Sequence, residues 1–504
     1  MLAAYAIPIL TAILSIFWYL LKRVQRRPPL PPGPRGLPIV GNLPFLDPDL
    51  HTYFTSLAQT HGSIFKLNLG SKLTVVISSP SLAREILKDQ DINFANHDVP
   101  LTGRAATYGG LDILWSPYGA EWRMLRKVCL LKLLSRKTLD SFYELRRKEI
   151  RERTRFLYKQ SRGEAPVNVG DQLFLTMMNL TMNMLWGGSV KAEEMASVGT
   201  EFKGVISEIT RLIGEPNVSD FFPWLARFDI QGLVKSMRVS ARQLDAVFDR
   251  AIKQMQQITS SDGECKDFLQ YLMKLKDQES DSEVPITLNH VKAVLTDMVV
   301  GGTDTSMNTV EFAMAELINK PELMKKAQQE LDQVVGKDNI VEESHITKLP
   351  YIVAIMKETL RLHPTLPLLV PRRPAEAAVV GGYTIPKDTK IFINVWCIQR
   401  DPNVWEKPTE FRPERFLDNN KPRDFTGTDY SYFPFGSGRR ICAGVALAER
   451  MVLYTLATLL HSFDWKIPQG HVLDLEEKIG IVLKLKTPLV ALPVPRLSDS
   501  NLYI

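Results

Sequence analysis

One cysteine, Cys442, stands in a setting that could hold a metal ion. It ends a glycine-rich loop, and an apolar segment with helical periodicity, residues 445–460, follows it. A sulfur at a helix start faces the positive end of the macrodipole and the free N–H groups of the first turn, so we expect a lowered thiol pKa. Gly436, Gly438 and Gly444 would let the backbone approach a flat ligand closely. These residue types predict a thiolate that can ligate iron.

A second motif places an acid beside a hydroxyl within a long helical pattern. The run Gly301-Gly302-Thr303-Asp304-Thr305-Ser306 lies inside residues 288–318. Two adjacent glycines cost about 1 kcal/mol each relative to alanine in a helix interior, and such a weak point can open a local groove. Asp304 and Thr305 could pass protons to a small ligand held there. Read alone, a packing-driven glycine pair explains such a segment more often.

These two motifs carry a resemblance to a known family. Residues 435–444 read Phe-Gly-Ser-Gly-Arg-Arg-Ile-Cys-Ala-Gly, which resembles the haem-binding signature of the cytochrome P450 family at every fixed position. The run 301–306 resembles the same family's oxygen-activation motif. The resemblance implies haem b with Cys442 as its axial thiolate and metal ligand. It also implies that Thr305 hydrogen-bonds the oxygen being activated and that Asp304 feeds protons to it through water.

The resemblance assigns further residues to the haem and its loop. Haem carries two propionates, which arginine forks and indole N–H groups can bind. Trp122 and Arg126 lie four residues apart, so both can face one ligand. Arg372, Phe435 and Arg440 join them as cofactor-binding residues through their positions in the family's pattern.

Three more charged residues receive a structural role. Glu358 and Arg361 are three residues apart on one helix face. Read alone, such a pair is usually a surface salt bridge worth about 0.5 kcal/mol. Residues 411–416 resemble the family's Pro-Glu-Arg-Phe element, which implies that Arg415 completes a Glu–Arg–Arg network. We expect this network to fix the loop that leads to Cys442.

Composition excludes several other classes of protein. The chain has 504 residues, of which 45% are hydrophobic and 23% charged, and its net charge is +6. That balance is ordinary for a globular protein and gives no reason to expect nucleic acid as a partner. The four cysteines are widely separated and show no Cys-x-x-Cys spacing, which indicates neither a disulfide framework nor a zinc site.

The N-terminus predicts a membrane anchor. Residues 1–21 are uncharged and mostly apolar, and about 20 residues span the roughly 30 Å hydrocarbon core. Four basic residues at positions 22–27 should stay cytosolic. A cleaved signal peptide is the alternative, but the segment lacks a basic start and a small-residue cleavage site. Residues 22–40, basic and proline-rich, predict a semi-rigid hinge before a catalytic domain over residues 41–504.

The remaining pattern predicts a mainly helical fold with minor sheet, as the resemblance also implies. Helices are expected over residues 81–88, 122–134, 141–159, 237–257 and 288–318, and strands over 64–77, broken at Gly70, and over 378–385, 390–394 and 479–485. Because no linker rich in Gly, Ser or Pro divides the interior, we expect one large haem domain behind a single transmembrane helix.

Electrons must reach this domain from another protein. No Gly-x-Gly-x-x-Gly motif follows a predicted strand, so neither a nucleotide nor a flavin domain is expected. In the resembling family the helix that carries Arg126 meets an acidic reductase, and residues 123–137 are rich in lysine and arginine here. The resemblance therefore implies an NADPH–cytochrome P450 reductase as partner and the endoplasmic reticulum membrane as location, with the catalytic domain in the cytosol.

The motif set resembles plant microsomal, or A-type, members that modify specialised metabolites. It implies a monooxygenase that uses O2 and hydroxylates a small lipophilic substrate. Segments 97–116, 296–300, 365–370 and 478–483 would face that substrate. We place a terpenoid first and a flavonoid or other phenolic compound second. One departure is His97, where related plant sequences often carry arginine.

Two other readings remain open. One is an O2-independent isomerase or dehydratase on the same fold, which the intact Asp304–Thr305 pair disfavours. The other is a haem-binding sensor or carrier without turnover.

Overall fold

The structure is a computed structural model that describes residues 29–187, 192–258, 267–278, 284–418 and 422–504. The α-helices in these ranges are α2 (Leu50–His61), α3 (Pro80–Arg84), α4 (Leu101–Ala106), α5 (Ala120–Val128), α6 (Arg136–Ser141), α7 (Tyr143–Arg162), α8 (Val169–Trp186), α9 (Ala192–Gly214), α10 (Val218–Phe221), α11 (Leu233–Ile258), α12 (Phe268–Asp277), α13 (Leu288–Asn319), α14 (Pro321–Val334), α15 (Pro350–Leu362), α16 (Val395–Ile398) and α17 (Val445–Ser462). None of them is long and apolar enough to cross a membrane. The expected anchor, residues 1–21, lies outside the described residues, so it stays a prediction.

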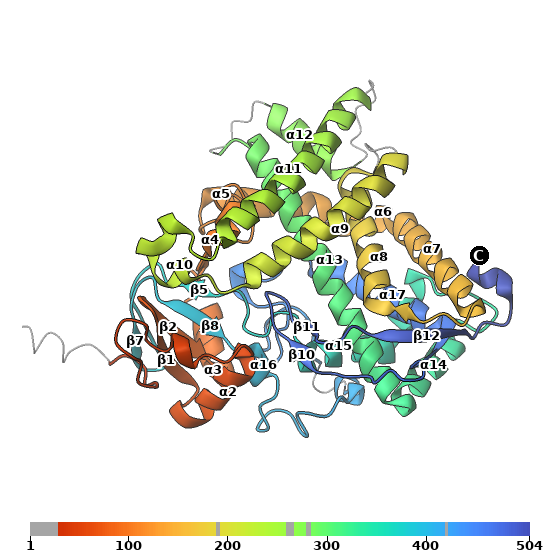
Figure 1. Ribbon diagram of the computed structural model, residues 1–504. Coiled ribbons are helices and arrows are strands. Elements are labelled where there is room, and N and C mark those ends of the chain that lie inside the picture. Colours follow the sequence, from red (N-terminus) through yellow and green to blue (C-terminus); the bar gives the residue numbers. More distant parts are fainter. Residues whose placement is uncertain (1–28, 188–191, 259–266, 279–283, 419–421) are drawn as a thin grey trace, which may run out of the picture.

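Helix α13 runs through the helical part of the molecule and packs against α8, α15 and α17 (Figure 1). Its start is fixed by a capping box, in which the backbone N–H of His290 donates to Thr287 Oγ1 at 3.3 Å and that of Thr287 donates to His290 Nδ1 at 3.1 Å. Most of its side chains are buried. The helix continues without interruption through Gly301 and Gly302, because packing on several sides offsets their low helix propensity.

A five-stranded sheet lies beside the helices, at the lower left of Figure 1, in the order β1-β2-β8-β5-β3. Its strands are β1 (Ile64–Leu69), β2 (Lys72–Ile77), β8 (Lys390–Ile393), β5 (Arg372–Arg373) and β3 (Asn96–His97). The turn between β1 and β2 uses Gly70 at φ 58°, a conformation that glycine adopts without strain. In the register of β3 and β5, His97 lies opposite Arg372.

The other sheets are small. β4 (Val167–Asn168), β12 (Val490–Pro495) and β9 (Phe463–Lys466) form a three-stranded sheet, whereas β6 (Ala378–Val380) pairs with β7 (Tyr383–Ile385) and β10 (Glu477–Lys478) with β11 (Lys484–Leu485). The strand expected over residues 479–485 is therefore wrong for its first part. Ile479 packs against the cluster around Leu368 instead, and Leu483 N–H donates to Thr365 O at 2.9 Å.

Two expected helices end in a π-helical turn. Residues 122–134 form α5 followed by a π turn over Cys129–Leu133, and residues 81–88 form α3 followed by one over Glu85–Asp89. Cys129 and Leu133 are both buried, whereas the three residues between them are exposed. This turn therefore presents Cys129 and Leu133 to the core and the residues between them to solvent.

The described part of the proline-rich segment lies along the sheet. Thr384 N–H donates to Pro29 O at 2.9 Å, and Lys66 N–H donates to Pro32 O at 2.7 Å. A Cβ at Gly33 would lie 2.1 Å from Lys66 O, so this close approach requires glycine. Residues 29–33 thus run against the domain, and a hinge function for residues 22–40 stays a prediction.

Candidate active site

The loop around Cys442 is folded tightly against its neighbours. Cys442 N–H donates to Phe435 O at 3.0 Å, and Gly444 N–H donates to Cys442 Sγ at 3.3 Å. Gly438 has φ 71°, and a Cβ there would lie 2.4 Å from Leu87 O. Gly436, at φ 76°, makes the preceding turn. Glycines at these positions let the loop curl and present a single sulfur.

The expected lowering of the thiol pKa is wrong for this loop. Cys442 is exposed to open space, yet it lies deep among protein atoms, and this burial raises the pKa of its thiol. The Gly444 N–H group and the charge of Arg126 act in the opposite direction without outweighing burial. Because α17 begins only at Val445, the sulfur receives one backbone hydrogen bond rather than the field of a full turn. A bound metal ion would favour the thiolate form of this sulfur.

Asp304 and Thr305 point in different directions from α13. Thr305 is partly accessible and donates to Gly301 O at 2.6 Å, and the space where a Gly301 Cβ would stand is open. The Asp304 side chain is 2% exposed and accepts from Lys484 Nζ on β11 at 2.7 Å. The hydroxyl thus faces open space, whereas the acid is held at the side of the helix by a lysine.

Three arginines converge near Cys442. Arg126 donates to Ile441 O at 2.7 Å, Arg372 to Ser437 O at 3.3 Å, and Arg440 to Ala95 O at 2.7 Å. Burial, together with the charges of Arg372 and Arg126, lowers the pKa of Arg440 to about 9. Burial likewise lowers the pKa of Arg372 to about 10, although the charge of Asp91 acts against this. Three cations that destabilise one another suit a ligand with more than one negative charge.

The indole ring of Trp122 lies against two of these arginines. The Trp122 ring has the Arg126 guanidinium 5.4 Å from its centroid and the Arg440 guanidinium at 4.4 Å. Its only donor, Nε1–H, donates to Ile113 O at 3.0 Å. Trp122 therefore contacts the two arginines through its ring, and its N–H, contrary to expectation, is not free for a propionate.

His97 lies beside these cations. The sequence analysis noted it as a departure from the family pattern and as the first residue of a segment expected to face the substrate. Burial lowers the pKa of His97 well below its ordinary value, and Arg372 and Arg440 lower it further. The neutral ring therefore donates from Nδ1 to Leu114 O at 2.7 Å. Its position opposite Arg372 across the sheet gave no sequence signal, because β3 contains only two residues.

The Glu358, Arg361 and Arg415 side chains contact one another as expected. Arg361 donates to both Glu358 carboxylate oxygens, at 2.6 and 2.9 Å, and Arg415 Nε donates to Oε1 at 3.0 Å. The Glu358 and Arg361 side chains are fully buried. Arg361 also donates to the carbonyls of Gln399, Pro408 and Glu410. One ion network thus ties α15 to the chain segment that precedes the cysteine loop.

The expected substrate-facing segments meet in pairs. Ile113 N–H donates to Asp297 Oδ2 on α13 at 2.6 Å, which joins segment 97–116 to segment 296–300. Leu483 N–H donates to Thr365 O at 2.9 Å, which joins segment 478–483 to segment 365–370.

This donor set fits haem. The exposed sulfur of Cys442 supplies an axial ligand, and the open space beside Gly301 leaves room for a small gas. The buried Arg372 and the half-buried Arg126 and Arg440 supply partners for two propionates. Cys442 would ligate iron, and Arg126, Arg372 and Arg440 would bind the propionates. Together these features define the site of a haem-thiolate protein.

Comparisons with known proteins agree with this class. The Cytochrome P450 family profile matches residues 31–492. The chain is 41% identical to flavonoid 3′-monooxygenase CYP75B137 of Crocosmia x crocosmiiflora, over 99% of both chains. It is 40% identical to 3,9-dihydroxypterocarpan 6A-monooxygenase of Glycine max, over 98% of this chain and 99% of that protein. A solved zebrafish cytochrome P450 with progesterone has a TM-score of 0.74 and 26% identity, and the match covers 90% of this chain and 100% of that one.

The chain belongs to the cytochrome P450 family. It is a haem-thiolate monooxygenase of the plant A-type, an oxidoreductase that acts on a small substrate with O2 and a redox partner.

Proposed function

We propose that the protein hydroxylates a flavonoid or a related phenolic compound. The observation that carries this proposal is the 41% identity, over 99% of both chains, to a flavonoid 3′-monooxygenase. A flavonoid 3′-monooxygenase of Petunia hybrida, at 41% identity over 94% of both chains, supports the same substrate class. The sequence analysis placed a terpenoid first and a flavonoid second. The names of these relatives favour the flavonoid.

The residues of this chain would bind and orient the substrate and would supply protons to the reaction. Haem, when bound, supplies the insertion of one atom of O2 into a C–H bond of the substrate. Thr305 would donate a hydrogen bond into the open space that it faces. After its carboxylate separates from Lys484, Asp304 would pass a proton through water to the same space. Apolar side chains of residues 365–370 and 479–483 would exclude bulk water and hold the flat substrate.

The electron donor that we propose is a membrane-bound NADPH–cytochrome P450 reductase. Five basic side chains are exposed on α5, α6 and the π turn between them: Arg123, Lys127, Lys132, Arg136 and Lys137. Arg126, on the same helix α5, is half-buried instead. An acidic partner would dock faster on this face. Reversing charge at Lys127 and Lys132 should raise the reductase concentration needed for half-maximal turnover, whereas reversal at Lys253 on α11 should not. Equal effects at both places would argue against this docking face.

We further propose that the protein is anchored in the endoplasmic reticulum membrane by residues 1–21, with the domain in the cytosol. Large apolar side chains are exposed between α10 and α11, where Trp224 and Phe228 are each 59% exposed and Ile230 is 64% exposed. Such a patch supports contact with a lipid surface. The full chain should resist carbonate extraction from microsomes while its domain stays open to protease. Release by carbonate would contradict the anchor.

The substrate proposal is tested with the full chain and reductase in microsomes. A flavonoid that lacks a 3′-hydroxyl should give a product heavier by one oxygen atom, only with NADPH and O2. A panel of terpenoids of similar size provides the comparison. Turnover of terpenoids without turnover of any phenolic compound would overturn the flavonoid assignment. Turnover of hydroperoxides without NADPH would instead support an isomerase or dehydratase.

A further inference from the structure

Two buried carboxyl groups meet beside the active site. Asp112 is fully buried in the loop between α4 and α5. Asp297 stands on α13, one turn before Gly301. Asp297 accepts a hydrogen bond from the backbone N–H of Ile113, the residue that follows Asp112, and this contact brings the two carboxyl groups close together. The family motifs assign no role to this pair.

One oxygen of each carboxyl group already accepts a hydrogen bond from a backbone N–H. Trp115 N–H donates to Asp112 Oδ1 at 3.0 Å, and Ile113 N–H donates to Asp297 Oδ2 at 2.6 Å. The other oxygen of Asp112, Oδ2, is buried and has no N–H or O–H donor among the described residues. Two ionised carboxylates are both acceptors and repel each other. Their contact therefore requires a proton between them.

We propose that Asp112 is a neutral carboxylic acid at neutral pH and donates its hydrogen to the carboxylate of Asp297, which clamps residues 112–116 onto α13. Asp297 is the better place for the charge, because the backbone N–H groups of Ile113 and Leu114 both point at it. Asp112 receives only one backbone donor from another residue, Trp115.

The electrostatic surroundings agree with this placement of the proton. Burial raises the pKa of Asp112 well above its ordinary value, and the charge and hydrogen bond of Asp297 raise it further. Burial raises the pKa of Asp297 only to about 6, because its backbone donors and the Asp112 hydrogen bond lower it. Two other groups face the pair, Arg440 near Asp112 and Cys129 near Asp297. Arg440 donates to backbone carbonyls rather than to either carboxyl.

The clamped loop orients the groups that would hold the haem propionates. Ile113 O accepts from Trp122 at 3.0 Å and from Arg440 at 2.9 Å, and Ser116 O accepts from Arg440 at 2.5 Å. Leu114 O accepts from His97 at 2.7 Å. Asp112 and Asp297 are thus positioning residues, which act on the haem pocket through the carbonyls of one short loop.

Infrared spectroscopy of the haem-loaded full chain tests the protonation state directly. At pH 7, Asp112→Asn should remove one C=O stretching band of a protonated carboxylic acid, recognised by its shift in D2O. Asp249→Asn, which replaces an exposed carboxylate paired with Lys292, should remove only carboxylate absorbance. If Asp112→Asn also removes only carboxylate absorbance, Asp112 is ionised and the proposal fails.

Haem retention tests the positioning role without measuring turnover. Asparagine offers an N–H in place of the acid's O–H, so Asp112→Asn should release haem to apomyoglobin at the wild-type rate. Asp112→Ala leaves Asp297 without that donor and should release haem about tenfold faster. Release from wild type should accelerate at alkaline pH, as the shared proton is lost, whereas release from Asp112→Asn should not. An alanine variant that retains haem as wild type does, or an asparagine variant that loses it as alanine does, would overturn the proposal.

Discussion

Lys484 Nζ lies 2.7 Å from Oδ2 of Asp304, so a lysine 180 residues further along the chain holds the acid of the oxygen-activation motif. The Asp304 side chain is 2% exposed, and that of Lys484 is 38% exposed. Lys484 belongs to β11, directly after the segment expected to face the substrate. Proton supply by Asp304 and substrate contact by residues 478–483 would therefore be linked through one side chain.

Replacing this lysine should uncouple electron use from product formation. In Lys484→Met the buried Asp304 loses its partner and its orientation, so the hydrogen peroxide formed per product should rise about tenfold. Lys484→Arg keeps the charge and should stay near wild type. The coupling is measured by the amounts of product and of hydrogen peroxide formed per NADPH consumed. Unchanged coupling in the methionine variant would show that Lys484 does not position Asp304.

Breaking the Glu358 network should destabilise the domain. Glu358→Gln leaves the fully buried Arg361 without its carboxylate partner, which should lower the free energy of unfolding by about 3–5 kcal/mol. Glu406→Gln, at an exposed carboxylate paired with Arg412, is the matched control and should change it by less than about 0.5 kcal/mol. Urea denaturation with haem content as a second readout distinguishes the two. Equal stability of both variants would contradict a structural role for Glu358.

His363 should make stability depend on pH. Its ring lies 3.0 Å from Glu316 and 2.6 Å from Glu477, at the edge of a polar cavity of about 840 Å³. Burial alone would lower the pKa of His363, but hydrogen bonds to Glu316 and Glu477 raise it above its ordinary value. A raised histidine pKa stabilises the folded state fully at low pH and loses that effect as pH rises above about 6.5.

Urea denaturation from pH 6 to pH 9 measures this dependence. Wild-type stability should fall with rising pH more steeply than that of His363→Gln. His471→Gln, at an exposed histidine, should keep the wild-type slope. A His363→Gln variant with an unchanged slope would mean that this histidine does not titrate with folding.

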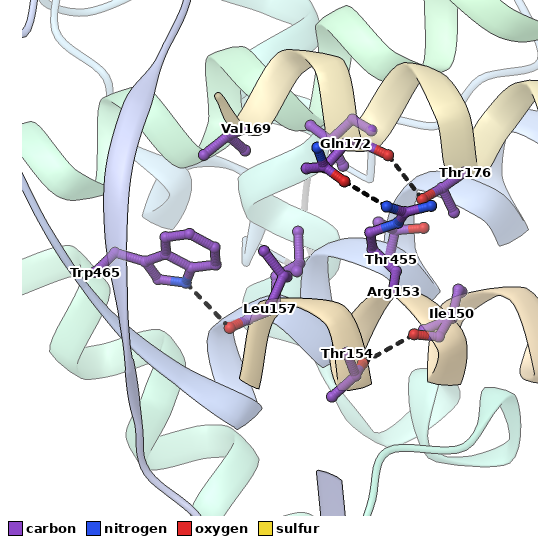
Figure 2. Close-up of a pocket in the computed structure, with 11 residues that line it drawn as sticks. Ile150, Arg153, Thr154, Leu157, Val169, Gln172, Thr176, Thr455 and Trp465 are labelled. Carbon is purple, nitrogen blue, oxygen red and sulfur yellow. Dashed lines mark hydrogen bonds between the residues drawn. The ribbon is translucent and has the colours of Figure 1, made fainter. Parts of the chain in front are cut away.

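A small cavity between α7, α8, α17 and β9 should tolerate a more apolar lining (Figure 2). Thr455 Oγ1 and Arg153 Nε are buried there without a hydrogen-bond partner among the described residues. Thr455→Val replaces the hydroxyl by a methyl group and should raise the free energy of unfolding by about 1 kcal/mol. Thr458→Val, which removes a hydroxyl that donates to Tyr454 O at 2.8 Å, should lower it. Loss of stability in Thr455→Val would show that a bound water satisfies this hydroxyl.

The sequence predicted local features where a strong pattern was present. The helix expected over residues 288–318 is α13 (Leu288–Asn319), and the turn at Gly70 separates β1 from β2. Helix α8 was missed, because most of its positions are buried and no polar face marks its period. The short strand β5 could be expected only from the family's pattern.

The rest of the site depends on distant contacts and on burial. No spacing in the sequence relates Lys484 to Asp304 or Asp112 to Asp297, because these pairs form only when the chain folds. The thiol pKa was predicted with the wrong sign, since the donors near Cys442 are local whereas the burial that outweighs them is set by the whole domain.

The central claim is that Cys442 ligates haem iron through its sulfur. The reduced full chain under carbon monoxide tests it most directly, with Cys442→Ser measured beside wild type and Cys397→Ser, a change at a cysteine outside the site, as control. Wild type and Cys397→Ser should show the long-wavelength Soret band of thiolate-ligated haem, and Cys442→Ser should lose that band together with hydroxylation. Retention of the band by Cys442→Ser, or its absence from haem-loaded wild type, would contradict the account.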